Sequence, residues 1–273
     1  MGYDCEGGAL SSLLKFLGFT FALSWALWSL AALVPAGAPF RIYLFLPGTF
    51  APAFVALWLG GRAVVERAFI WQVKARWYLF ALFYMAALKL AAALVHRLAT
   101  GTWPAIEPGP WLVFVGGTLV STPFQAGEEI GWRGFALPRL SERIGLAGAS
   151  LVLGVIWATW HLPLFLIAGT DTTGQSVPFF VLSVTAISVA LAWLYARTGG
   201  SLLLVMLMHA AANNTPHFIP PPVSGNIWAL HATPAQWLTA LFLWIGAACL
   251  LISIPKRITP LPSPGTPLQV PTR

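Results

Sequence analysis

The stretch Glu128-Glu129-Ile130-Gly131-Trp132-Arg133 closes a long apolar run at residues 111–126. Ionisable groups at membrane depth are costly, so they usually face a protein interior or a wet cavity and mark function. Two more polar sites of this kind follow, Trp157-Ala-Thr-Trp-His161 and His209-Ala-Ala-Ala-Asn213. We expect these three pieces to build one site inside a membrane protein.

The composition predicts a polytopic membrane protein. Of the 273 residues, 58% are hydrophobic and only 8% are charged, whereas a soluble domain carries about 25% charged residues. The 14 tryptophans suit interfacial belts, where an indole keeps its N–H wet. The net charge of +7 comes from basic residues spread over short loops with no run of five or more. We therefore expect membrane lipids, and no nucleic acid, as partners.

Eight segments are apolar enough for a membrane-spanning helix, which needs about 20 residues. They are residues 13–34, 42–59, 77–95, 111–137, 146–168, 177–196, 201–219 and 235–254. Pro47 and Pro52 predict that the second is kinked or short. The charged stretch 62–76 is typical of an interfacial helix. The predicted class is an all-α polytopic membrane protein with about eight transmembrane helices.

The chain reads as one domain. Residues 1–254 form a single transmembrane domain without internal repeats, and the proline-rich residues 255–273 are predicted to be a disordered tail. The first segment is interpreted as a retained helix. The only two cysteines, Cys5 and Cys249, lie near opposite ends, which indicates neither a disulfide framework nor a thiolate zinc site.

Orientation follows from Lys and Arg in the short loops. With a cytoplasmic N-terminus, 11 of them lie on the cytoplasmic side and 2 on the other. Both termini are therefore predicted to be cytoplasmic. Lys89 and Arg133 are placed within spans, and Lys89 receives no role. Glu128, His161 and the His209–Asn213 pair then all lie roughly 12 to 22 Å below the cytoplasmic face, at about 1.5 Å per helical residue.

The three motifs supply complementary chemistry. Glu129 and Arg133 are spaced i, i+4, so they share a helix face and can pair. Glu128 points about 100° away and is a good general base for water in a partly dehydrated cavity. His161 could share that water or hold a metal. His209 and Asn213 can both aim at one carbonyl oxygen, as donors to an oxyanion do.

Plainer interpretations stand beside this one. Glu129–Arg133 could be only a structural ion pair, and intramembrane His and Asn side chains commonly bridge helices. The cluster could also serve a non-enzymatic scaffold, an immunity factor or a transporter. The sequence has no His-Glu-x-x-His zinc helix, no Gly-x-Ser-x-Gly elbow and no P-loop.

The set Glu-Glu-x-x-x-Arg, aromatic-x-x-x-His and His-x-x-x-Asn resembles the CPBP family of intramembrane proteases, also called the Abi family. This family includes the CAAX-type prenyl endopeptidases and bacteriocin-processing proteins. The matching core spans about residues 114–216. One departure is Trp157, where the family usually has Phe, and it keeps an aromatic wall. The resemblance implies an endopeptidase in a bacterial or archaeal cell membrane, with a conical intramembrane active-site cavity open toward the cytoplasm.

The resemblance also implies roles for single residues. Glu128 and His161 would activate water, and His209 and Asn213 would bind the oxyanion. Glu129, Arg133 and Trp157 would support the site. The family is labelled as metalloproteases, and a zinc ion would use Glu128, His161 and His209, but a metal-free glutamate mechanism is equally open. The substrate would be a membrane-associated or lipidated peptide or protein, with prenylated CAAX tails as one option.

Overall fold

The computed structural model describes residues 3–104, 111–216 and 218–255, with side chains from Leu10 onward. The predicted tail therefore lies, from residue 256 on, outside the described residues. Within them the regular secondary structure is helical apart from one isolated bridge between Gln175 and Val223. Helices are expected because a backbone in hydrocarbon must satisfy its own hydrogen bonds. Six of the described helical stretches are long and apolar enough to cross a membrane. The all-α, multi-pass membrane class is thus confirmed.

The helices follow one another along the chain, and residues 214–233 connect the last two. The α-helices are α1 Tyr3–Ala32, α2 Ile42–Gly60, α3 Ala63–Glu66, α4 Ala75–Thr100, α5 Trp111–Ser121, α6 Ala126–Glu129, α7 Leu137–Trp160, α8 Val177–Arg197, α9 Leu202–Asn213 and α10 Pro234–Ile252. Single 3₁₀ turns form η1 Pro39–Arg41, η2 Arg67–Phe69, η3 Thr122–Gln125 and η5 Leu162–Leu166, and a π-helix forms η4 Ile130–Ala136. The interfacial helix predicted at residues 62–76 is reduced to α3 and η2.

The difference between eight predicted segments and six candidate spans has two sources. The fourth and fifth segments lie in one helical stretch, Trp111–Leu166. Gly145 interrupts it with φ 70° and ψ 163°, a backbone that glycine adopts readily. The chain therefore changes direction there, and the predicted segments lie on either side of the break.

The seventh segment, predicted to reach residue 219, ends as α9 at Asn213 and has only 12 residues. Pro216 disfavours helical backbone at the residue before it. The Asn214 side chain donates to the carbonyl of Ala210 at 2.8 Å, which competes with continuation of the helix. The prediction overlooked these two signals.

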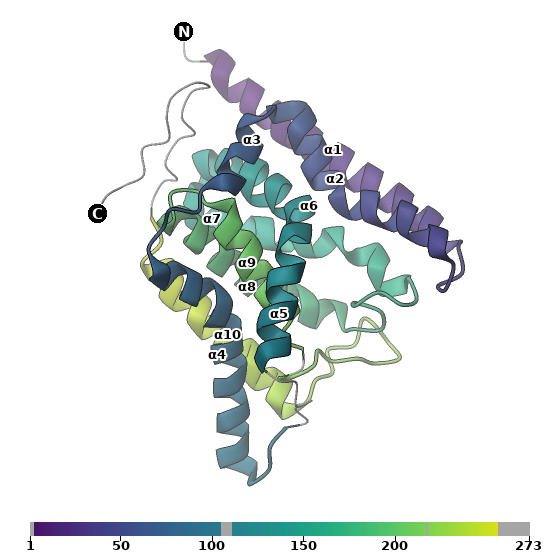
Figure 1. The fold of residues 1–273 in the computed structure, drawn as a ribbon, viewed down its shortest axis with the longest axis vertical. Coiled ribbons are helices and arrows are strands. Elements are labelled where there is room, and N and C mark those ends of the chain that lie inside the picture. Colours follow the sequence, from purple (N-terminus) through teal and green to yellow (C-terminus); the bar gives the residue numbers. More distant parts are fainter. Residues whose placement is uncertain (1–2, 105–110, 217, 256–273) are drawn as a thin grey trace.

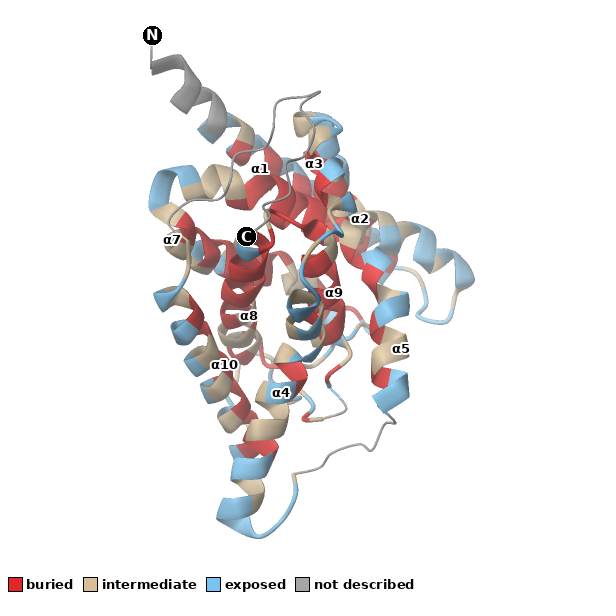
Figure 2. Cartoon of the chain, turned by 60° about the vertical axis from the view of Figure 1, so that its left-hand side comes forward, coloured by how far each residue is buried: buried red, intermediate tan, exposed pale blue. Residues whose placement is uncertain are grey.

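The helices pack around a central pair, α8 and α9. Figure 1 shows α1 and α2 side by side along one edge and α4 beside α10 along another. Helix α8 also packs against α7 and α10, and α9 packs against α4 and α5. Burial is concentrated on α8 and α9, whereas α4, α5 and α10 expose much of their surface (Figure 2). The centre of this arrangement is where the polar motifs meet.

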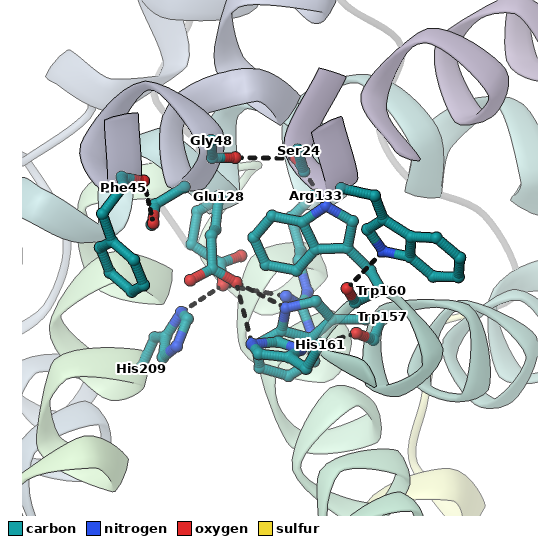
Figure 3. A network of polar contacts seen from close by, with 12 residues as sticks. Ser24, Phe45, Gly48, Glu128, Arg133, Trp157, Trp160, His161 and His209 are labelled. Atoms are coloured by element: carbon teal, nitrogen blue, oxygen red, sulfur yellow. Dashed lines mark hydrogen bonds and ion pairs between the residues drawn. The ribbon is translucent and has the colours of Figure 1, made fainter. Parts of the chain in front are cut away.

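Helix α2 carries its two prolines without interruption, and a neighbouring helix compensates for one of them. Pro52 has no N–H, so the carbonyl of Gly48 lacks its usual intrahelical donor. Ser24 Oγ of α1 donates to that carbonyl at 2.7 Å. The same Oγ accepts from Trp160 Nε1 at 2.9 Å. This chain of bonds ties α1 and α2 to the end of α7, next to His161 (Figure 3).

Glycines let η4 approach α2 closely. A Cβ on Gly131 would lie 2.6 Å from the carbonyl oxygen of Pro52, and one on Gly127 would lie 2.9 Å from Phe50 Cγ. Small residues four apart are a common way for membrane helices to pack backbone to backbone. The two adjacent glutamates are thus held against α2, between Gly127 and Gly131.

Candidate active site

Glu128 and Glu129 end α6 directly before the π-helix η4, a type of turn found frequently at functional sites. Their environments differ. The Glu128 side chain is 10% exposed, whereas the Glu129 side chain is fully buried at 0%. Adjacent helical residues point about 100° apart, which explains this division. Only Glu128 is accessible to water or to a bound substrate.

Glu128 and His161 lie side by side at the centre of the site (Figure 3). Glu128 Oε2 accepts a hydrogen bond of 2.6 Å from Trp157 Nε1 and lies 3.9 Å from His161 Nε2. His161 Nδ1 donates to the backbone carbonyl of Trp157 at 2.8 Å. A neutral His161 therefore carries its lone pair on Nε2. Two bases face each other at a spacing that is too long for a direct hydrogen bond.

Glu129 forms a second, deeper cluster with Arg133 and His209. Its Oε1 accepts from Arg133 Nη1 at 2.9 Å and from His209 Nδ1 at 2.7 Å. The predicted i, i+4 pairing with Arg133 is present, and both side chains are 0% exposed. Within the described part of the chain, Glu129 Oε2 and two guanidinium nitrogens of Arg133 have no hydrogen-bond partner. The contact is a single strong bond rather than a two-bond fork.

Trp157 joins the two clusters. Its N–H binds Glu128, its ring lies 4.2 Å from Arg133 Cζ, and the His209 ring meets it edge-on with centroids 5.0 Å apart. A cation over an indole face is a favourable contact. The sequence interpretation treated Trp157 only as an aromatic wall. Its indole N–H, which phenylalanine lacks, is the feature that interpretation missed.

Asn213 is the motif residue that the structure does not bring into direct contact with the rest. It ends α9, one turn after His209, and its side chain is exposed. No hydrogen bond of its amide is found among the described residues. The backbone at the end of α9 therefore sets where this amide points.

The donors do not form a metal site in this arrangement. In the described residues no three His, Cys, Asp or Glu side chains come together closely enough to hold a metal ion. Glu128 and His161 approach each other, and His209 donates its Nδ1–H to Glu129. Glu128, His161 and His209 are thus not gathered into a three-ligand zinc site in this arrangement, and the chemistry proposed for the site uses the chain's own base and donors.

The region of this chain that matches known proteins includes the same motif residues. Residues 108–215 match the family described as Type II CAAX prenyl endopeptidase Rce1-like. This segment of the chain is similar to that family. The matched segment contains every motif residue from Glu128 to Asn213. The predicted resemblance to CPBP proteases is thereby confirmed.

A curated relative supports the match. The chain is 30% identical over 92 residues to CAAX prenyl protease 2 of Methanococcus maripaludis. The similarity covers 32% of this chain and 34% of that protein. The chain thus matches about a third of the length of this relative.

Proposed function

We propose that this chain is an intramembrane endopeptidase, similar to CAAX prenyl proteases, that hydrolyses peptide bonds of membrane-associated proteins or peptides. The observation that carries the proposal is the 3.9 Å spacing between Glu128 Oε2 and His161 Nε2. The Rce1-like match around these residues supports it. The remaining contacts of the site suggest roles for Trp157, His209 and Glu129.

A water molecule can bind Glu128 and His161 at once. Hydrogen bonds of about 2.8 Å to each form a compact triangle with the 3.9 Å spacing. Both acceptors are then filled by the protons of one water, and its oxygen lone pairs are free to attack a carbonyl carbon. Glu128 takes a proton from the water as general base. His161 orients the water, because its Nδ1–H is held by the carbonyl of Trp157.

His209 and Asn213 would stabilise the oxyanion that forms. An ionised Glu129 can only accept, so His209 Nδ1 carries the proton of their 2.7 Å bond. His209 donates to an oxyanion through Nε2 only as the imidazolium, and Glu129 stabilises that charge. Asn213, one turn further along α9, adds a neutral donor. Donors aimed at the developing charge are usually a large part of such catalysis.

Membrane orientation is part of the proposal. Both termini are cytoplasmic, and the site opens toward the cytoplasm through a conical cavity. The distribution of Lys and Arg supports this orientation. Thiol labelling of Cys5 in intact cells is the measurement. Cys5 should react only after the membrane is permeabilised, and modification from outside would refute the orientation.

The decisive experiment is cleavage of membrane-anchored peptides by purified protein in proteoliposomes. Glu128→Gln keeps the shape of the side chain but removes the base, so cleavage should fall to background in a folded protein. Glu142→Gln is the matched control, because Glu142 is exposed on α7 and should leave cleavage unchanged. Cleavage by Glu128→Gln equal to that by the parent would contradict the role of Glu128 as base, and absence of cleavage by the parent would overturn the proposal and favour a scaffold or immunity function.

Two further measurements with the same assay determine the substrate class and the metal dependence. Peptides with and without a prenylated cysteine test whether lipidation is required for cleavage. A chelator followed by zinc tests the metal: inhibition reversed by zinc would make Glu128 a metal ligand or the base for a metal-bound water. Cleavage that persists under chelation would support the glutamate mechanism.

A further inference from the structure

Lys89 lies in the middle of the membrane-spanning helix α4, yet its ammonium is turned inward. Lysines in such helices usually extend along the helix to place the charge at the interface. Lys89 Nζ instead donates to the backbone carbonyls of Thr215 and Ile219, at 3.0 and 3.1 Å. Both acceptor residues are buried, with 0% and 3% exposure. Lys89 therefore holds a segment of backbone inside the protein.

That segment directly follows α9. The C-terminal end of a helix carries unpaired carbonyls and a partial negative charge, which a cation stabilises. Thr215 stands two residues after the end of α9 at Asn213. Its carbonyl also accepts from the backbone N–H of Phe218 at 3.1 Å, so Lys89 and a backbone N–H share this acceptor. None of the ion pairs found in the described residues involves Lys89. Its hydrogen-bond partners in that part of the chain are the carbonyls of Thr215 and Ile219.

The end of α9 is held from a second side as well. Asn214 Nδ2 donates to Ser121 Oγ of α5 at 3.0 Å. The close approach depends on Gly117, where a Cβ would lie 2.7 Å from Asn214 Oδ1. Helices α4 and α5 thus hold the last turn of α9 between them. Asn213 sits in that turn without a hydrogen bond of its own among the described residues.

We propose that Lys89 is a positioning residue for the reaction: it fixes the C-terminal end of α9 and, through the backbone, the direction of the Asn213 amide. This inference rests on the proposed proteolysis, and it assigns a task to a charged residue outside the Rce1-like match. His209 depends less on Lys89, because Glu129 holds its ring directly.

The test compares Lys89→Met with the parent protein. Methionine fills similar space but donates no hydrogen bond, so kcat should fall about 10- to 100-fold, the scale of a misplaced catalytic group, with KM little changed. In an Asn213→Ala background the same change should cost no more than about twofold, the usual error of additivity. Lys15→Met, on the exposed face of α1, is the matched control and should behave as the parent does.

A readout without substrate separates this proposal from the function. Hydrogen exchange at the backbone amides of Asn214, Thr215 and Phe218 should be faster in Lys89→Met than in Lys15→Met. This change would support the positioning role even if the parent cleaved no peptide, an outcome that would overturn only the proposed function. Unchanged exchange, or an equal loss of kcat with and without Asn213, would overturn the role of Lys89.

Should Lys89→Met fail to fold, Lys89→Arg carries the test. A guanidinium can donate to both carbonyls, so normal exchange at Asn214 and Thr215 together with normal kcat would support the proposal. Normal exchange with reduced kcat would overturn it, because Lys89 would then act by some means other than the backbone of α9.

Discussion

Replacing Arg133 by methionine removes the only guanidinium contact of the buried Glu129 carboxylate among the described residues. Both side chains are 0% exposed and joined by a bond of 2.9 Å. Leaving a buried charge without its partner typically costs about 3–5 kcal/mol. Arg133 also contributes its contact with the Trp157 ring at 4.2 Å, worth about 1–2 kcal/mol when desolvated. Because His209 remains as a partner of Glu129, we expect the free energy of unfolding to fall by about 4 kcal/mol in all.

Thermal unfolding in detergent measures this loss. For chains of this size about 1 kcal/mol corresponds to roughly 2–4 °C, so Arg133→Met should lower Tm by about 8–16 °C. The double variant Arg133→Met with Glu129→Gln removes both charges. It should recover part of the stability, because no uncompensated ion remains buried. The amide oxygen of Gln can still accept from His209.

Two results would refute this reasoning. A Tm for Arg133→Met equal to that of the parent would mean that Glu129 does not need its partner. A double variant less stable than Arg133→Met alone would mean that the two residues contribute independently, whatever their distance. Arg62→Met is the control, because Arg62 is exposed and should leave Tm unchanged.

Three further changes probe other parts of the site. Trp157→Phe keeps an aromatic ring but loses the N–H that binds Glu128. The value of kcat/KM for peptide cleavage should fall about tenfold, which corresponds to the ~1.5 kcal/mol of a hydrogen bond to a charged group. An unchanged kcat/KM would show that the indole N–H has no part in the mechanism. Asn213→Ala should lower kcat about 100- to 1000-fold, the usual effect of one lost oxyanion donor, and a loss to background like that of Glu128→Gln would contradict the separate roles. Gly131→Leu should abolish folded protein in size-exclusion chromatography because its side chain would meet the backbone of Pro52, whereas Gly116→Leu, with open space around it, should elute normally.

Relations within one helix were predictable from residue spacing. The i, i+4 interval places Arg133 on the face of Glu129, and their 2.9 Å bond is present. The rotation of about 100° per residue separates Glu128 from Glu129, and their exposures differ accordingly. The apolar composition likewise predicts helices, because a backbone in hydrocarbon has few other ways to satisfy its hydrogen bonds.

Relations between helices came only from packing. Glu128 binds the N–H of Trp157, and Glu129 binds His209. No spacing along the chain specifies these partners, since they depend on which faces of α6, α7 and α9 are brought together. The end of α9 is a different case, because Pro216 and Asn214 are signals within the sequence itself: local hydrogen bonds stop at Asn213 the helix that was predicted to reach residue 219.

Lys89 illustrates the same limit most clearly. From sequence it is one cation in an apolar helix, and its long flexible side chain can reach the interface, a wet cavity or a neighbouring helix. The choice is made by the carbonyls of Thr215 and Ile219, which become available only when α4 packs against α9. Residue types and intervals therefore determine the chemistry this protein can bring to the membrane. Tertiary packing determines which groups meet, because a buried polar group takes the partner that the neighbouring helix presents.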